Sequence, residues 1–125
     1  MPSPSQQFGS QAELMVAGYL KKQGYRIVEH NYRTRFGEID IIARHRDVIV
    51  FIEVKARKTD PFTDPYIDPK WAVTPEKQRR IAMAALYYLK TTCQSQARAR
   101  FDVATVLCQS PPHIELYQNA FNFPA

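Results

Sequence analysis

Residues 38–55, with the sequence EIDIIARHRDVIVFIEVK, consist of two apolar segments joined by a short polar turn. The segments 38–44 and 47–55 are rich in β-branched residues, and this composition predicts two strands. The turn through His45 and Arg46 is too short for a helical crossover, so the strands must be antiparallel. The apolar start of the second segment is typical of a central strand, and the hairpin therefore decides how the rest of the chain is arranged.

Each strand of this hairpin carries an acidic residue among apolar ones. Glu53 and Lys55 share one strand face, because successive side chains alternate between the two faces. On the other strand, Asp40 is expected to point away from Ile39 and Ile41. Since Asp40 and Glu53 lie about equally far from the turn, we expect their carboxylates to be cross-strand neighbours.

Adjacent carboxylates repel each other, and three arrangements relieve the repulsion. They can bind a divalent cation, share a proton or pair with arginine. Oxygen ligands favour Mg²⁺ or Mn²⁺ over zinc. With such a metal on Asp40 and Glu53, Lys55 is placed to orient or deprotonate a water, or to stabilise charge on a scissile phosphate. These residues are the parts of a metal-dependent phosphodiesterase.

Two helices are predicted outside the hairpin. Ser10 and Glu13 match a capping box, and Gly24 fits the position after a last helical turn, which predicts a helix over residues 10–23. A Thr-Pro pair followed by an apolar stripe predicts a second helix over 75–91.

Further strands are predicted at 25–33, 100–107 and 113–118, where β-branched and aromatic residues lie between turn residues. The element order is αβββαβ, with a further strand at the end. This order indicates an α/β fold with a mixed central sheet.

The length of 125 residues fits one domain over 1–125. Residues 1–7 and 122–125 are expected to be loose. Residues 59–74 hold three prolines, each preceded by aspartate, and predict a long loop. Loops of this length without structure of their own are often functional.

The chain carries 17 Lys and Arg against 12 Asp and Glu, a net charge of +5. The basic residues are clustered, so the fold could gather them on one face that binds nucleic acid; the alternative is a scattered basic surface that only maintains solubility. No apolar run approaches the roughly 20 residues that cross a bilayer, and no secretory signal is present, so no membrane partner is expected. With two isolated cysteines, this favours a cytoplasmic protein.

Five sequence words occur in an order that is similar to a known family: GEID, FIEVKAR, AVTPEKQRRI, RFDV and NAF. Together they resemble the YraN-type family of predicted nucleases, placed in the PD-(D/E)XK nuclease superfamily and related to archaeal Holliday junction resolvases. The resemblance runs over nearly the whole chain. It implies a restriction-endonuclease-like αβββαβ core, the order predicted above from the residues alone.

The resemblance also implies roles for single residues. The superfamily acid falls on Asp40, the E-x-K on Glu53 and Lys55, the acid of the first helix on Glu13 and the polar residue of the second helix on Gln78. The implied metal ligands are Asp40 and Glu53, with Glu13 assisting. Glu13 has a structural alternative, because the capping box alone explains it. Between the E-x-K strand and AVTP, family members usually have a shorter, glycine-containing segment in place of the proline-rich residues 59–71.

Basic residues near these motifs are the candidates for contact with nucleic acid. Those at the start of the second helix oppose its dipole, which suggests a phosphate ligand, although a solvated first turn explains them too. Tyr66 and Trp71 in the long loop are candidates for stacking on a base. Asp102 next to Arg100 is interpreted as a structural ion pair. The predicted nucleic-acid contacts are Arg33, Arg35, Arg57, Lys77, Arg79 and Arg80.

Three functions remain open from the sequence. The first is a nuclease that hydrolyses DNA, more than RNA, with Mg²⁺ or Mn²⁺. The second is a non-catalytic nucleic-acid-binding module whose acids are satisfied by Lys and Arg. The third is a protein–protein adaptor in DNA metabolism that uses the proline-rich loop. Because resolvases act on two-fold junctions as dimers, a homodimer stays open beside a monomer.

Overall fold

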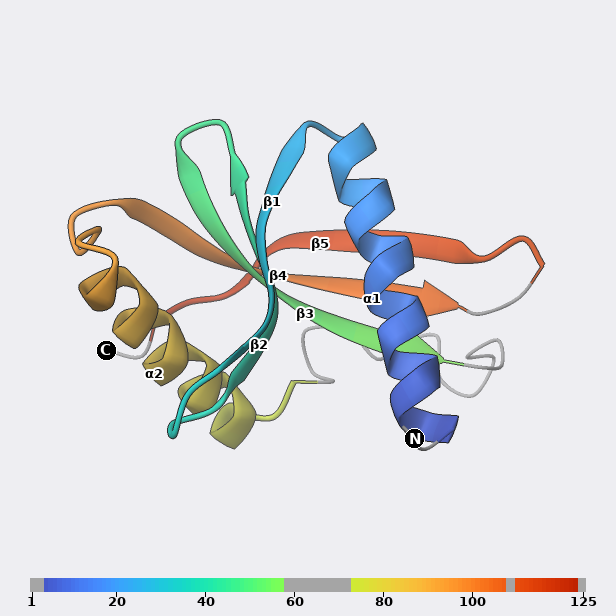
Figure 1. The fold of residues 1–125 in the computed structure, drawn as a ribbon, viewed down its shortest axis with the longest axis horizontal. Helices are drawn as coiled ribbons and strands as arrows, with labels where there is room; N and C mark the ends of the chain where they lie inside the picture. The colour runs from blue at the N-terminus through green and yellow to red at the C-terminus, as the bar shows by residue number, and fades with distance from the viewer. Residues whose placement is uncertain (1–3, 58–72, 108–109, 124–125) are drawn as a thin grey trace.

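A computed structural model describes residues 4–57, 73–107 and 110–123. Within these ranges a five-stranded sheet lies between two helices (Figure 1). Most of the predicted loop at 59–74, with Tyr66 and Trp71, lies outside the described residues. The elements are α1 (Pro4–Lys22), β1 (Tyr25–Arg33), β2 (Glu38–His45), β3 (Val48–Arg57), α2 (Pro75–Thr91), β4 (Arg98–Leu107) and β5 (His113–Phe121).

The sheet has the strand order β1-β2-β3-β4-β5. The first three strands pair antiparallel, which confirms the predicted hairpin. β4 then pairs parallel with β3, a connection that requires a crossover and uses α2, and β5 returns antiparallel along β4. The result is the predicted α/β fold with a mixed sheet, and it is consistent with a restriction-endonuclease-like core.

The two helices cover opposite faces of β3. Val50 and Ile52 pack in one cluster with Val16 of α1. Phe51, which points to the other face, packs in a second cluster with Ile81 of α2. A strand that is buried on both faces needs apolar residues at successive positions, which explains the unbroken run at the start of β3.

The first helix is longer than the sequence predicts. α1 begins at Pro4 and not at Ser10, so the capping box of Ser10 and Glu13 is wrong. Proline favours the first position of a helix, and here that signal prevails over the local S-x-x-E pattern. Gly24 follows α1 with φ of 90°, as the predicted helix end requires. Neither described helix has the length and apolar character of a membrane span.

The described residues nearest the two ends of the chain belong to the fold. Residues 4–7 form the first turn of α1. At the other end, Phe123 packs on the ring of Phe101 with a centroid separation of 4.5 Å, so residue 123 is held against the core. This contact buries an aromatic surface that the sequence alone left without a partner.

Asp102 forms the predicted structural ion pair. It is fully buried, and its Oδ1 lies 3.0 Å from Nε of Arg100. The backbone N–H of Asn119 donates to the same carboxylate at 2.9 Å, and the Tyr25 hydroxyl lies within reach of its other oxygen. A buried charge is stable when it is paired and hydrogen-bonded in this way.

Candidate functional site

The candidate site lies where β2 separates from β3. Their backbone pairing runs from His45 and Val48 to Ile41 and Ile52, whereas β3 remains paired with β4 as far as its last residue. At the point of separation, Asp40 accepts a hydrogen bond from the backbone N–H of Val54 at 2.8 Å. A carboxylate therefore takes the place of a backbone acceptor, and the hairpin opens into a cleft.

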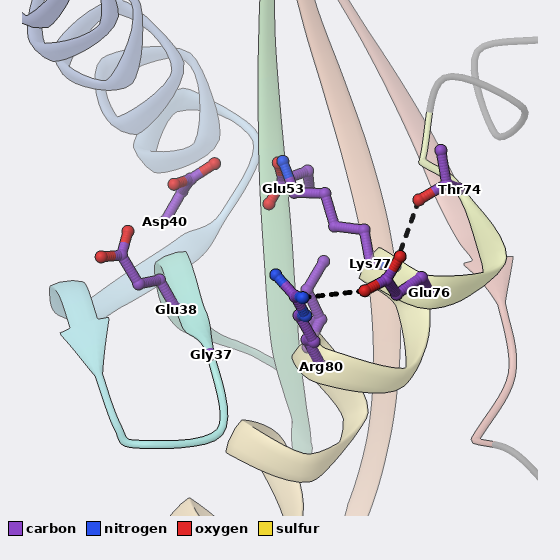
Figure 2. A pocket seen from close by; sticks show the side chains of 9 residues that line it. Gly37, Glu38, Asp40, Glu53, Thr74, Glu76, Lys77 and Arg80 are labelled. Carbon is purple, nitrogen blue, oxygen red and sulfur yellow. Dashed lines mark hydrogen bonds and ion pairs between the residues drawn. The ribbon is translucent and has the colours of Figure 1, made fainter.

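The cleft lies between this opening and the first turn of α2 (Figure 2). Its volume is about 560 Å³. Acids from the hairpin face bases from the helix across it, so the cleft carries both signs of charge. The charged residues that line it are Glu38, Asp40, Glu53, Glu76, Lys77 and Arg80.

The structure brings the two predicted acids together. Asp40 and Glu53 are the next residues after the last backbone pair of the hairpin, and their side chains share a hydrogen bond. Burial and the charge of Glu53 raise the pKa of Asp40 to about 7. Glu53 is itself only 5% exposed. Such a pair needs a proton or a cation to be stable at neutral pH.

Strand β2 does not alternate regularly around Asp40. Ile39 packs in the cluster beneath α2, whereas Ile41 packs in the cluster beneath α1, so the prediction that they share a face is wrong. The neighbouring strand is irregular at the same level, because Asn31, which lies opposite Asp40, has φ of 50°. Asp40 consequently lies at the boundary of the two layers.

Two lysines contact Glu53. The Nζ atom of Lys77, from the first turn of α2, lies 2.5 Å from Oε1 of Glu53 (Figure 2). The Nζ atom of Lys55, two residues further along β3, lies 3.7 Å from the same oxygen. The Lys55 contact follows from the alternation of β3. The Lys77 contact was missed, because the sequence does not reveal how α2 is oriented toward β3.

The environments of the two lysines move their pKa values apart. Burial lowers the pKa of Lys55, and its hydrogen bond to Lys77 and the charge of that residue lower it further. Burial acts in the same direction on Lys77, but the hydrogen bond and charge of Glu53 outweigh it and raise its pKa. Lys55 is therefore the lysine that gives up a proton more readily.

Glu13 approaches the acids from α1. Burial raises its pKa, a hydrogen bond to Asn31 opposes the rise, and the charges of Glu53 and Glu38 add to it. These interactions place Glu13 within electrostatic range of the cleft. Because α1 begins at Pro4, the capping box no longer explains this residue.

Gln78 is not among the residues that line the cleft. Its side-chain amide donates to the backbone carbonyl of Val73 at 2.9 Å. Its backbone N–H donates to the carbonyl of Thr74, the N-cap residue of α2. Gln78 therefore fixes the start of α2, while Lys77 beside it reaches the acids.

The predicted basic residues lie at different distances from the cleft. Arg80 lines it and pairs with Glu76 at 2.8 Å. Arg33 pairs with Glu38 at the rim at 3.4 Å, so this acid is both a cleft residue and an arginine partner.

Arg35 and Arg79 do not line the cleft. Arg35 lies over the ring of Phe36 at 4.9 Å, and Arg79 is exposed on α2. Arg57 ends β3, and its side chain lies outside the described residues.

Gly37 is a cleft residue to which the sequence assigned no role of its own. A Cβ atom at this position would lie 2.9 Å from the backbone carbonyl oxygen of Arg80. The turn is held by the Thr34 hydroxyl, which accepts from the backbone N–H groups of Phe36 and Gly37. Glycine thus allows the β1–β2 turn to approach α2 and close one side of the cleft.

The donor set fits a hard divalent cation. Asp40 and Glu53 offer adjacent oxygens in a place where negative charge is poorly solvated, which is what Mg²⁺ and Mn²⁺ require. Among the described residues no group of three His, Cys, Asp or Glu side chains is arranged to hold a metal. Mg²⁺ commonly binds through one or two carboxylates and takes its other ligands from water and substrate phosphate, so Asp40 and Glu53 would be sufficient to hold it.

The fold and the site together define an α/β protein with a restriction-endonuclease-like core and an acidic pair at the split of its central hairpin. The chain belongs to the family described as "Uncharacterised protein family UPF0102", whose model matches residues 12–106. This membership agrees with the resemblance to YraN-type proteins.

Relatives in this family align over nearly their full length. A UPF0102 protein of Desulfosudis oleivorans is 48% identical over 122 residues, which is 98% of this chain and 95% of the relative. A UPF0102 protein of Syntrophus aciditrophicus is 50% identical over 114 residues, 90% of this chain and 87% of the relative. The names of these relatives give the family and state no activity.

Proposed function

We propose that this protein is a nuclease of the PD-(D/E)XK superfamily that hydrolyses phosphodiester bonds in DNA, with Mg²⁺ or Mn²⁺ as cofactor. The observation that carries the proposal is the pairing of the acids Asp40 and Glu53 in the cleft, with the amine of Lys55 3.7 Å from Glu53. Sites of this kind bring together groups whose pKa values are shifted by burial and by each other. The cytoplasm is the expected compartment, and DNA is expected more than RNA.

Each residue has a distinct part in the proposed reaction. Asp40 and Glu53 would hold the metal, and Mg²⁺ or Mn²⁺ bound there would supply Lewis-acid stabilisation of charge on the phosphate. Lys55, whose pKa is lowered, accepts a proton from the attacking water or stabilises the developing charge. Glu13 adds negative charge beside the acids, and Gln78 supports the helix that carries Lys77.

The substrate is recognised mainly through its phosphates. The net charge of +5 favours an anionic polymer. Arg80, which lines the cleft, and Arg33, which pairs with the cleft residue Glu38, would contact phosphates near the reacting one. Contacts of this kind position a strand without reading its sequence.

One observation favours the non-catalytic binding module as second candidate. The Lys77–Glu53 ion pair satisfies the buried acid within the protein, which is what a site without a metal requires. The adaptor reading depends on residues 59–74, most of which lie outside the described residues.

DNA cleavage separates these candidates. Linear and four-way-junction DNA are incubated with Mg²⁺ or Mn²⁺ and the wild type, Asp40→Ala or Glu53→Ala. Cleavage by the wild type alone supports the nuclease. Salt-sensitive binding without cleavage by any of the three supports the binding module, and absence of binding supports the adaptor. Equal cleavage by all three proteins would place the activity outside this site.

A further inference from the structure

We infer that Lys77 is a displaceable counter-ion, which occupies Glu53 when the metal is absent and moves to a phosphate of the substrate when the metal binds. Lys77 and the metal would thus compete for one carboxylate. The inference rests on the proposed function, and it adds a regulating contact to the same site.

The burial of Glu53 makes a counter-ion necessary. Only 5% of this residue is exposed, and an ionised carboxylate in such a place is stable only if it is paired. Of the two lysines that contact this carboxylate, Lys77 lies nearer, with its Nζ at 2.5 Å from Oε1. Loss of this partner without a replacement leaves an uncompensated buried charge.

Lys77 is better able to leave Glu53 than Lys55 is. The side chain of Lys77 is 43% exposed, whereas that of Lys55 is 27% exposed. Lys55 is attached to the same strand as Glu53, two residues away, so its position follows that of the strand. Lys77 reaches across the cleft from another element on a flexible stem (Figure 2).

A metal on Glu53 would remove the reason for this contact. Two cations beside one carboxylate oxygen repel each other strongly in a buried place. The alternative position for the Lys77 amine is in the cleft, beside Arg80 and at the start of α2. There a phosphate is favoured by both side chains and by the helix N-terminus. Metal binding would therefore prepare a phosphate site, and a bound phosphate would strengthen metal binding by the same factor.

The test measures Mn²⁺ affinity without DNA, from the electron paramagnetic resonance signal of free Mn²⁺. The variant Lys77→Met removes the charge and keeps the stem. Arg80→Met is the matched control, because Arg80 lines the same cleft but pairs with Glu76. We expect Lys77→Met to bind Mn²⁺ about 5- to 100-fold more tightly than the wild type, the usual range of coupling between two sites. Arg80→Met is expected to shift the affinity by less than about threefold.

Equal shifts for the two variants, or weaker binding by Lys77→Met, would overturn the inference. Mn²⁺ binding that is absent, or that persists unchanged in Asp40→Asn, would overturn the metal site of the proposed function as well. If Lys77→Met does not fold, Lys77→Gln replaces it, since glutamine keeps a donor to Glu53 without the charge. Thermal unfolding gives a second readout: Mn²⁺ should raise the melting temperature of the Lys77 variant more than that of the wild type.

Discussion

At the level of single residues, Asp40 makes two interactions that have opposite effects on its pKa. It accepts the hydrogen bond of Val54 at the place where the hairpin opens, and it lies against a second buried acid. The first interaction favours its charged form, while burial and Glu53 disfavour it and prevail. The folded protein therefore holds a proton on Asp40 more tightly than the unfolded chain does.

This raised pKa makes stability depend on pH. The contribution of Asp40 is fully present below its unfolded pKa of about 3.9 and is lost as pH rises through its folded pKa of about 7. Asp40→Asn removes the titration and can still accept the Val54 hydrogen bond. We expect the variant to gain about 1–3 kcal/mol relative to the wild type between pH 5 and pH 8, measured by urea unfolding. A stability difference that is the same at both pH values would contradict the assigned environment.

Asp102 provides the opposite case among the buried acids. Its carboxylate is matched by Arg100, Tyr25 and Asn119, so it has a structural role. We expect Asp102→Asn to lower the free energy of unfolding by about 2–4 kcal/mol at pH 7, because Arg100 loses its buried partner. The same urea titrations test this. A stability equal to that of the wild type would show that the ion pair is dispensable.

At the scale of the element, local sequence signals predicted the parts whose causes are local. The short turn required an antiparallel hairpin, and the Thr-Pro pair marked the start of α2, where the Thr74 hydroxyl accepts from the Lys77 N–H at 3.2 Å. The predicted start of α1 at Ser10 was wrong, because the S-x-x-E pattern there competed with the proline at position 4, where the helix begins. The contact of Lys77 with Glu53 could not be predicted from local sequence, because it depends on how α2 packs against β3 after the crossover.

Gly37 tests the fit between the β1–β2 turn and α2. Gly37→Ala places a Cβ only 2.9 Å from the carbonyl oxygen of Arg80, which is closer than van der Waals contact, so the turn must move away from the helix. We expect a loss of about 1–3 kcal/mol in stability, the usual cost of overpacking, together with weaker DNA binding. Gly18→Ala is the control, because a Cβ there meets nothing within 4 Å, and it should not destabilise α1. Urea unfolding measures the stability of both variants. If Gly37→Ala is as stable as the wild type, the turn does not define the cleft.

Over the molecule as a whole, the net charge could be predicted from the sequence, but the placement of that charge could not. Basic side chains from β1 and α2 meet at the cleft, while Arg98 begins β4 beside the first residue of β3, at the other end of the sheet from Glu53. The hairpin pattern predicted Asp40 and Glu53 in advance, and the resemblance added Glu13. The pairing of Arg33 with Glu38 and the position of Arg80 required the assembled sheet and helix.

This distribution of charge predicts which arginines contribute to DNA binding. Each phosphate contact adds about 0.9 to the slope of log affinity against log salt for duplex DNA. Arg80→Met should therefore reduce the slope by about 1, whereas Arg98→Met, a loss of the same charge far from the cleft, should leave it nearly unchanged. Fluorescence anisotropy at several salt concentrations measures both slopes. Equal effects of the two substitutions would indicate binding by net charge alone.

The nuclease proposal itself depends on the rate of DNA cleavage under single-turnover conditions with Mn²⁺, compared between the wild type and Asp40→Asn. Glu38→Gln is the control, since Glu38 lines the same cleft from the same strand but pairs with Arg33. The predicted result is a loss of at least about 100-fold for Asp40→Asn, with DNA binding retained, and a much smaller loss for Glu38→Gln. Wild-type protein that binds DNA and leaves it intact, or Asp40→Asn that cleaves as fast as the wild type, would contradict a metal-dependent nuclease centred on Asp40 and Glu53.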